Sequence, residues 1–322
     1  MIYPNDPLTY TNPVYPKYFA DPFVLRHDGQ YYAYGTGARA LANGLRFEVL
    51  TSDDLVHWHS LGGALQPLES DASDYWAPEV AFNDGQFYMY YSAGIGDKGH
   101  HLRVAVSTRP EGPFVDAGVI LTGDDPFTID ASPFRDPKDG SWYLFYARDF
   151  LDGKRVGTAL AVDRMLSMTS LEGSPRTVLR ASGDWQLYAK ARLMYGLEYD
   201  WHTLEGPFVV AHETCYYCFY SGGAWTNPSY GVAYAVADNP LGPWTETTPT
   251  SPTLLKTIPD HVIGPGHNSV VTAPDGVDYL IYHAWDVAQT ERRMCIDAIH
   301  WTPNGPRTAG PSFTPQPAPR RQ

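Results

Sequence analysis

Short apolar and aromatic runs alternate with turn residues along the chain, and five of these runs repeat one arrangement. The copies are "DPFVLRHDGQYYAYGTG" (21–37), "APEVAFNDGQFYMYYSAG" (77–94), "ASPFRDPKDGSWYLFYAR" (131–148), "GPFVVAHETCYYCFYSGG" (206–223) and "HNSVVTAPDGVDYLIYHAW" (267–285). Each copy predicts an apolar strand, a turn, and an aromatic strand that ends in small residues. Four copies carry Asp-Gly in the turn. This pair predicts a tight hairpin, because glycine tolerates the positive φ that such turns require.

The sequence after each copy has room and pattern for two further strands, as in "HLRVAVSTRPEGPFVDAG" after the second. The copies begin near residues 21, 77, 131, 206 and 267, at intervals of roughly 55 to 75 residues, which is typical of four-stranded propeller blades. We therefore predict an all-β protein, a single-domain five-bladed β-propeller over residues 1–322. The proline-rich segment at about 306–322 is expected to be a C-terminal tail. Only 184–201 has a pattern that could form a long helix, and it is interpreted as an insertion.

Composition and charge narrow the choice of partners. The chain contains 29 Gly and 28 Pro, and 14% of its residues are aromatic, which favours strands and turns. Its formal net charge of −13 would repel phosphate groups, so we expect no nucleic-acid partner. No apolar run has the length of a membrane span and no leader-like segment opens the chain. We expect no membrane partner, and a protein that is either cytoplasmic or secreted with its leader absent from this chain.

The first strand of each propeller blade lies beside the central axis, so residues at its start converge on one pocket. These positions carry Asp21, Trp76-Ala77, Asp130, Glu205 and His267. One such acid alone is more often a turn or strand-cap residue. Three carboxylates together, walled by the aromatic residues Phe19, Trp76 and Trp225, have the parts for glycoside hydrolysis.

At this point the chain resembles glycoside hydrolase family 43, five-bladed propeller enzymes that act on arabinose- and xylose-containing polysaccharides. The resemblance is carried, in family order, by "ADPF" (20–23), "WAPEV" (76–80), "TIDASPFRDPKDGSWYLFY" (128–146), "LEGPFV" (204–209), "GHNSV" (266–270) and "RRMCIDAIHW" (292–301). It implies that Asp21 is the general base, that Glu205 is the general acid, and that Asp130 tunes the pKa of the acid and positions it.

The resemblance also implies roles around these acids. Arg292 would steady the substrate, although the neighbouring Arg293 could be the arginine that faces inward. His267 matches an axial histidine near a bound cation or water cluster, so a structural Ca²⁺ is expected beside it. No cofactor is required for the chemistry.

The predicted function is an inverting glycoside hydrolase that releases terminal pentose, α-L-arabinofuranose and/or β-D-xylose, from hemicellulose-derived oligosaccharides or arabinan. The insertion near 184–201 and the loop at 149–155 favour removal of terminal sugars, because they could narrow the pocket. An endo-acting arabinanase or a galactan-acting hydrolase of the same family is the alternative.

Two further alternatives depend on particular residues. "FRDP" (134–137) is similar to a motif of retaining fructosidases, but the other motifs of those enzymes differ, and Asp136 is interpreted as a turn residue. A non-catalytic sugar-binding propeller would not need the acid trio. We interpret His283 as a core histidine, and Cys215 and Cys218 as structural strand residues on opposite faces.

Overall fold

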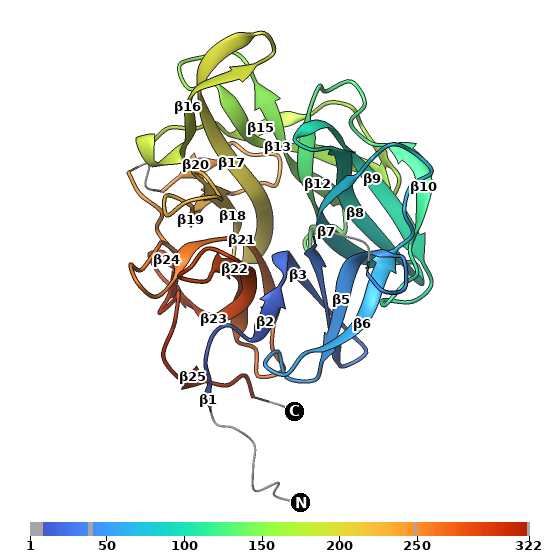
Figure 1. The fold of residues 1–322 in the computed structure, drawn as a ribbon, viewed down its shortest axis with the longest axis vertical. Coiled ribbons are helices and arrows are strands. Elements are labelled where there is room, and N and C mark those ends of the chain that lie inside the picture. Colours follow the sequence, from blue (N-terminus) through green and yellow to red (C-terminus); the bar gives the residue numbers. More distant parts are fainter. Residues whose placement is uncertain (1–8, 38–40, 248–249, 321–322) are drawn as a thin grey trace, which may run out of the picture.

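The computed structural model describes residues 9–37, 41–247 and 250–320, and its regular structure is almost entirely β-strand. Five blades stand around a central axis, and the chain passes through them in order (Figure 1); short parallel pairing of β13 (Gly157–Ser167) with β17 (Leu197–His212) joins the third and fourth blades into one sheet. The innermost strands are β3 (Ala20–His27), β7 (Asp74–Asn83), β11 (Thr128–Arg135), β17 (Leu197–His212) and β21 (Ile263–Thr272). Each contacts the next and β21 contacts β3, so the ring is closed. The fold is the predicted five-bladed β-propeller.

The outer strands of each blade follow in chain order and pair antiparallel. Blades 1 and 2 add β4 (Gln30–Thr36), β5 (Arg46–Ser52), β6 (His59–Leu65), β8 (Gln86–Ile95), β9 (Lys98–Ser107) and β10 (Val115–Ile120). Blade 3 adds β12 (Trp142–Phe150), β13 (Gly157–Ser167), β14 (Ser170–Leu171) and β15 (Arg176–Leu179). Blades 4 and 5 add β18 (Cys215–Gly222), β19 (Gly231–Ala237), β20 (Thr245–Glu246), β22 (Asp278–Trp285) and β23 (Arg292–Thr302).

Both ends of the chain complete the fifth blade. The strand β2 (Tyr15–Tyr18) pairs with β23 as its outer neighbour. An N-terminal strand thus forms the outer edge of the last blade and links it to the first. The segment predicted to be a tail is partly in sheets: β24 (Gly305–Thr308) pairs with β23, and β25 (Gln316–Pro317) pairs with β1 (Thr9–Tyr10). Proline is tolerated in these short edge strands, where one side of the backbone needs no partner.

The insertion at 184–201 is a β-hairpin, and η1 (Asp184–Gln186) is its only helical turn. The strand β16 (Leu187–Met194) pairs antiparallel with the first half of β17. Tyr195 and Gly196 turn the chain with φ of 51° and 79°, the two positive values that a tight hairpin requires. This hairpin, called the arm (residues 187–201), projects at the top of Figure 1.

The same β-bulge recurs in all five innermost strands. In each, two residues oppose one residue of the second strand, and the first of the two has a positive φ. These first residues are Asp21, Ala77, Asp130, Gly206 and His267. A bulge bends a strand and redirects a side chain, and bulges are common beside active sites. The bulge residue therefore marks the equivalent position in the five repeats better than the proline of each repeat does. The proline is less regular because Pro133 lies three residues after the bulge residue Asp130.

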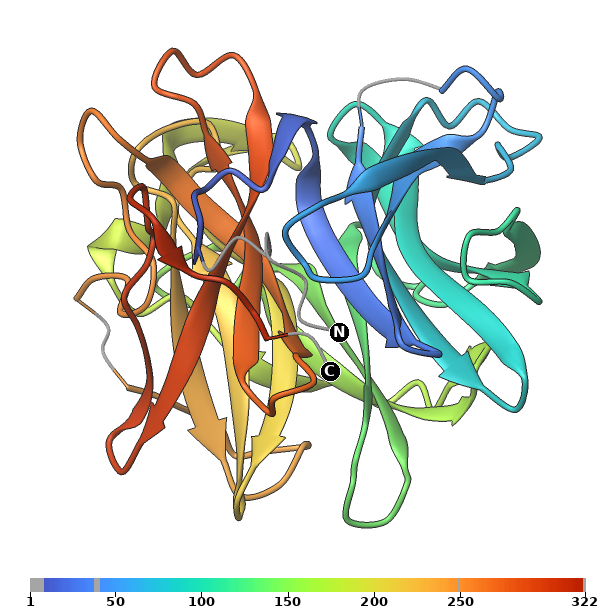
Figure 2. The same cartoon turned by 90° about the horizontal axis from the view of Figure 1, so that it is seen from below.

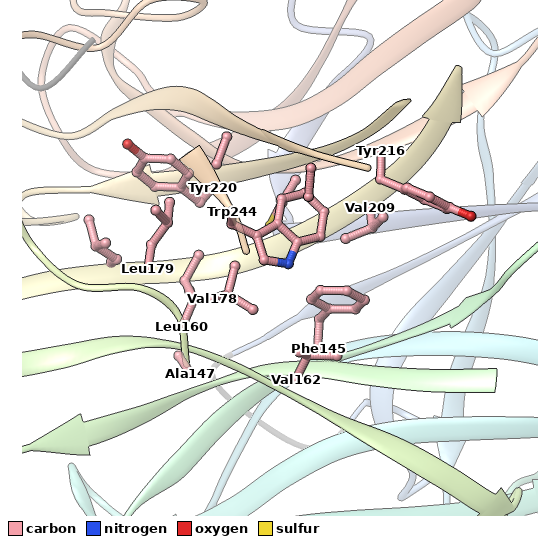
Figure 3. Close-up of a cluster of buried hydrophobic side chains, with 14 of the residues drawn as sticks. Phe145, Ala147, Leu160, Val162, Val178, Leu179, Val209, Tyr216, Tyr220 and Trp244 are labelled. Atoms are coloured by element: carbon pink, nitrogen blue, oxygen red, sulfur yellow. The ribbon is translucent and has the colours of Figure 1, made fainter. Parts of the chain in front are cut away.

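Apolar and aromatic side chains fill the space between neighbouring blades. Figure 3 shows the layer between blades 3 and 4, where Phe145 meets the Trp244 ring edge-on with ring centroids 5.8 Å apart. Figure 2 shows blade 1 in blue between blade 2 in cyan and blade 5 in orange and red.

In the described part of the chain, no helix has the length and apolarity to cross a membrane.

Candidate active site

A pit of about 380 Å³ lies at the axis, where the innermost strands begin. It is lined by Tyr18, Asp21, Thr36, Gly37, Ser73, Asp74, Tyr75, Trp76, Asp97, Ile129, Asp130, Tyr188, Glu205, Trp225, His267 and Arg292. The structure therefore brings together all three candidate carboxylates, the axial histidine, the arginine and two of the three predicted aromatic walls. These residues come from strands far apart in sequence and from the arm.

Phe19 is the exception among the predicted site residues. Its side chain is 1% exposed and belongs to the core cluster between blades 5 and 1, where it meets Tyr15 edge-on. The residue precedes the bulge at Asp21 by two positions, and its ring lies against Gly35 of the neighbouring strand. The expectation that Phe19 walls the pit is wrong, because the adjacent Tyr18, the last residue of β2, lines it instead.

The bulges explain how one kind of strand places different groups in the pit. Asp21, Asp130 and His267 occupy the bulge position itself, with φ of 49°, 60° and 49°. Glu205 directly precedes the bulge residue Gly206. A non-glycine residue in the left-handed region costs about 1–3 kcal/mol, and such strain is common at functional sites. Three of the candidate groups thus stand at strained positions that the surrounding sheets maintain.

Arg292 and two buried histidines surround the carboxylate of Asp21. Its Oδ1 lies 3.3 Å from Nη1 of Arg292, 3.4 Å from Nδ1 of His267 and 3.3 Å from Nδ1 of His283. Burial alone would raise the pKa of Asp21, but His267, Arg292 and His283 outweigh it and hold the pKa far below its usual range. Asp21 is therefore ionised over the whole physiological pH range, as a general base must be.

Glu205 and Asp130 have the opposite tendency. Burial, and then the charge of Asp21, raise the pKa of Glu205 to about 7, against a 2.7 Å hydrogen bond that the Tyr230 hydroxyl donates to its Oε1. Burial and the charges of Glu205 and Asp21 raise the pKa of Asp130 well above its usual range. Repulsion acts on both members of such a pair, so ionised Asp130 opposes ionisation of Glu205. The pair holds a proton near neutral pH.

Arg292, rather than Arg293, faces the pit. It is 8% exposed, bonds Asp21, and donates from Nη2 to the Tyr18 hydroxyl at 2.7 Å. Its guanidinium lies over the ring of Trp225, 4.4 Å from the centroid. Arg293 instead pairs with Asp286 and Glu291. The question that the sequence left open is therefore settled by which side of β23 each arginine occupies.

The aromatic walls are supported from behind. Trp225 stacks on Trp285 with ring centroids 6.0 Å apart, and the Trp285 indole N–H donates to the Trp225 carbonyl at 2.7 Å. Trp76 stacks on the buried His100 with ring centroids 3.6 Å apart. Burial lowers the pKa of His100 to about 4, so this ring is neutral at physiological pH. Flat, fixed rings of this kind suit the apolar faces of sugars.

Sequence reasoning missed two groups that touch the candidate acids. Tyr230, at the edge of β19, bonds Glu205, and nothing in its local sequence indicates this. His283, interpreted as a core histidine, is fully buried but accepts a 3.1 Å hydrogen bond at Nδ1 from the Asp21 backbone. Its position in blade 5 corresponds to Thr36 and Ser221, which accept hydrogen bonds from the bulge residues Ala77 and His267. That recurring polar position was the available signal.

The predicted Ca²⁺ stays a prediction, and the donors beside His267 do not by themselves favour it. Ca²⁺ prefers six to eight oxygen ligands. Nδ1 of His267 faces Asp21 and lies 4.0 Å from Oδ2 of Asp130. Nowhere in residues 9–37, 41–247 and 250–320 do three or more His, Cys, Asp or Glu side chains form a group that could hold a metal ion.

Asp136, Cys215 and Cys218 lie outside the pit lining. Asp136 is buried, and both of its carboxylate oxygens lie 2.8 Å from the Tyr216 hydroxyl, while Oδ1 also accepts from the backbone of Lys138. It stabilises the turn before Gly140, as predicted. Cys215 and Cys218 are free thiols, and Cys218 is fully buried.

The pit thus holds an ionised carboxylate and a protonated carboxyl group between aromatic walls. Glycoside hydrolases use such a pair of groups for catalysis. Residues 10–306 match the family model for glycosyl hydrolases family 43. The chain belongs to this family.

Relatives and solved structures agree with the match. A beta-D-galactofuranosidase of Aspergillus niger is 29% identical over 91% of this chain and 83% of its own length. An extracellular exo-alpha-(1->5)-L-arabinofuranosidase of Streptomyces chartreusis is 28% identical over 86% of this chain and 83% of its own. The crystal structure of a thermostable family-43 glycoside hydrolase has a TM-score of 0.85 at 34% identity, covering 98% of this chain and all of that one.

Proposed function

We propose that this glycoside hydrolase removes terminal pentose, first of all α-L-arabinofuranose, from oligosaccharides or arabinan, with inversion at the anomeric carbon. β-D-Xylose is the second pentose in the proposal. The observation that carries it is the pairing of Asp21, whose pKa is held far below its usual range, with Glu205, whose pKa is about 7, in one pit. Inverting and retaining glycoside hydrolases both need one ionised and one protonated carboxyl group across the scissile bond, so the anomer released distinguishes the two mechanisms.

In the proposed reaction, Asp21 takes a proton from a water molecule as the water oxygen bonds to the anomeric carbon. The glycosidic bond breaks on the opposite face of the sugar, and its oxygen receives the proton of Glu205. Asp21 is then protonated and Glu205 ionised, and exchange with solvent restores both. Arg292, which bonds Asp21, keeps that carboxylate ionised and oriented between turnovers.

Asp130 acts through the acid rather than on the sugar. Its Oδ2 accepts a 2.9 Å hydrogen bond from the backbone N–H of Gly206, next to Glu205. This contact fixes the position of the β17 bulge, and the negative charge of Asp130 opposes loss of the proton from Glu205. The residue therefore serves both position and protonation.

The relatives support furanosides as the first substrates to test. The Streptomyces chartreusis relative is an exo-acting arabinofuranosidase, and the Aspergillus niger relative is a galactofuranosidase. β-D-Galactofuranose has the ring configuration of α-L-arabinofuranose with one added exocyclic carbon. A side cavity that adjoins the pit, with Thr158 and Thr203 in its lining, favours galactofuranoside as a second candidate substrate.

The test is a panel of chromogenic α-L-arabinofuranoside, β-D-xyloside, β-D-galactofuranoside and fructoside substrates, with proton NMR of the first anomer released. We expect hydrolysis of the arabinofuranoside with inversion. Release of the retained anomer would contradict the mechanism, and hydrolysis of the fructoside alone would contradict the substrate class. If the wild type hydrolyses none of these substrates, and the Glu205→Gln variant binds sugar with the same affinity as wild type, the protein is a sugar-binding propeller instead.

A further inference from the structure

The pit continues on one side into a smaller cavity of about 80 Å³ beneath the arm. Six residues line both spaces: Trp76, Asp97, Ile129, Tyr188, Glu205 and Trp225. The arm contributes Tyr188, Arg192, Met194 and Trp201 to the smaller cavity. The boundary between the arm and blade 2 therefore decides how far the pit extends past the candidate acid.

One ion pair joins the arm to blade 2 at this boundary. Nη2 of Arg192, on β16, lies 3.1 Å from Oδ2 of Asp97, in the turn between β8 and β9. Both residues line the smaller cavity, and Asp97 also lines the pit. The bridge thus connects two segments that are far apart in sequence, directly beside the proposed site of cleavage.

An exposed ion pair is weak by itself, and the side chain of Asp97 is 61% exposed. Arg192, however, is held by aromatic rings: its guanidinium lies 4.9 Å from the Tyr188 centroid and 5.6 Å from that of Trp201. These contacts restrict the side chain before it pairs, so less conformational entropy is lost when the bridge forms.

The turn that carries Asp97 is also fixed. The backbone N–H of Gly96 donates to Oδ2 of Asp74 at 2.8 Å, and Nε2 of His100 lies 2.9 Å from the Gly96 carbonyl. His100 in turn stacks on Trp76. The turn and the aromatic wall of the pit are therefore held by the same side chain.

The base of the arm is anchored on blade 4. Gln186 is fully buried, accepts hydrogen bonds from the backbones of Ser182 and Gly183, and donates to Glu246 at 2.9 Å. The hydroxyls of Ser182 and Tyr220 also bond Glu246. The arm is thus held at its base and at Arg192, while its tip is exposed, with Leu193 at 74% and Leu197 at 60%.

We propose that the Arg192–Asp97 bridge is a specificity-determining element that closes this side of the pit, so that only the end of a sugar chain is accepted. This inference rests on the proposed function, because it concerns the same site and assumes pentose-releasing activity. With the bridge intact, a chain cannot pass between the arm and blade 2. Without it, the two cavities open into a groove that admits the interior of a chain.

The experiment uses two linear pentose oligosaccharides labelled at the reducing end, one with a free and one with a methylated hydroxyl at the non-reducing terminus where the next sugar would attach. Wild type is expected to shorten the free substrate one sugar at a time and to leave the methylated one intact. Arg192→Ala and Asp97→Ala are expected to cleave the methylated substrate at a rate about tenfold or more above the background measured with wild type. The double variant Arg192→Asp, Asp97→Arg should restore the block.

Arg180→Ala is the matched control, since Arg180 makes a similar exposed ion pair with Asp152 at 3.0 Å but lines neither cavity. Thermal melting shows whether each variant is folded. Folded Arg192→Ala and Asp97→Ala proteins that leave the methylated substrate intact would overturn the inference, as would a wild type that cleaves it. A wild type that hydrolyses no pentoside would instead overturn the proposed function.

Discussion

Asp130 accepts a hydrogen bond of 2.9 Å from the backbone N–H of Gly206, the residue that directly follows Glu205. One blade thereby holds the bulge of the next at the point where the candidate acid leaves the strand. Burial and the charge of Glu205 raise the pKa of the same Asp130 carboxyl group, so the two groups titrate as a coupled pair. Asp130 is thus linked both to the position of the acid and to its titration.

Asp130→Asn should keep the geometry and remove the charge, because the amide oxygen can still accept from Gly206. Without the repulsion, the pKa of Glu205 falls, so the basic limb of the kcat/KM profile should move to lower pH and the rate at pH 7 should decrease. The pH dependence of kcat/KM for wild type and variant measures this shift. An unchanged basic limb would show that Asp130 does not influence the acid.

The wild-type pH profile follows from the two pKa shifts. Glu205 must be protonated, and its protonated fraction falls as pH rises through about 7, so activity should decrease about tenfold per pH unit above that point. Asp21 must be ionised, and its pKa lies far below the usual range, so its titration should cause no loss of activity at mildly acidic pH. A steep loss of kcat/KM between pH 6 and pH 5 on a fully folded enzyme would contradict the assignment of Asp21.

Glu205→Ala and Asp21→Ala should differ in their dependence on the leaving group. An aryl group that leaves readily needs little protonation, so Glu205→Ala should keep part of the activity on such substrates and lose about 10²–10⁴-fold on poor ones. Asp21→Ala should lose activity on both, since water attack is impaired in each case. Rates on a series of aryl glycosides measure the difference, and equal losses in the two variants would argue against the assigned roles.

Arg292→Ala and Arg293→Ala form a neighbouring pair with opposite expectations. Arg292 bonds Asp21 and Tyr18 in the pit, whereas Arg293 pairs with Asp286 and Glu291. We expect Arg292→Ala to reduce kcat/KM by about 100-fold or more, because Asp21 loses a buried charge partner. Arg293→Ala should stay close to wild type, and steady-state kinetics on both variants will decide.

Asn12→Ala tests ring closure. The Asn12 amide donates to the Ile296 carbonyl at 2.8 Å and accepts from the Ile296 N–H at 2.9 Å, which joins the N-terminal segment to β23. Loss of these bonds should reduce the free energy of unfolding by about 1–3 kcal/mol, with kcat unchanged. Denaturant unfolding measures the effect, and Asn83→Ala, which removes only a contact with the adjacent Asp84, is the control. Equal stability of the two variants would contradict a closing role.

Much of this architecture was readable from the chain because it repeats local patterns. Asp28-Gly29 and Asp84-Gly85 form hairpin turns with positive φ at both residues, as Asp-Gly in an alternating apolar context predicts. The alternation of side chains along each strand predicts what is buried, and the order of the repeats places Asp21, Asp130 and Glu205 within one residue of the same point of their innermost strands. Local preference and repetition are sufficient for these features, because each depends on neighbours in sequence.

The long-range partners needed the tertiary structure. Phe19 and Tyr18 are adjacent aromatic residues, and only strand orientation decides that one enters the core and the other the pit. Tyr230 bonds Glu205, His283 bonds Asp21, and Arg192 pairs with Asp97 beside the pit, all through the closure of five blades around one axis. Sequence alone thus determined the blades and the acids they carry. Ring closure decided which residues set the protonation states of these acids and which residues border the pit. The pKa of a buried group and the access of substrate to it depend on groups that are distant in sequence and close only in space.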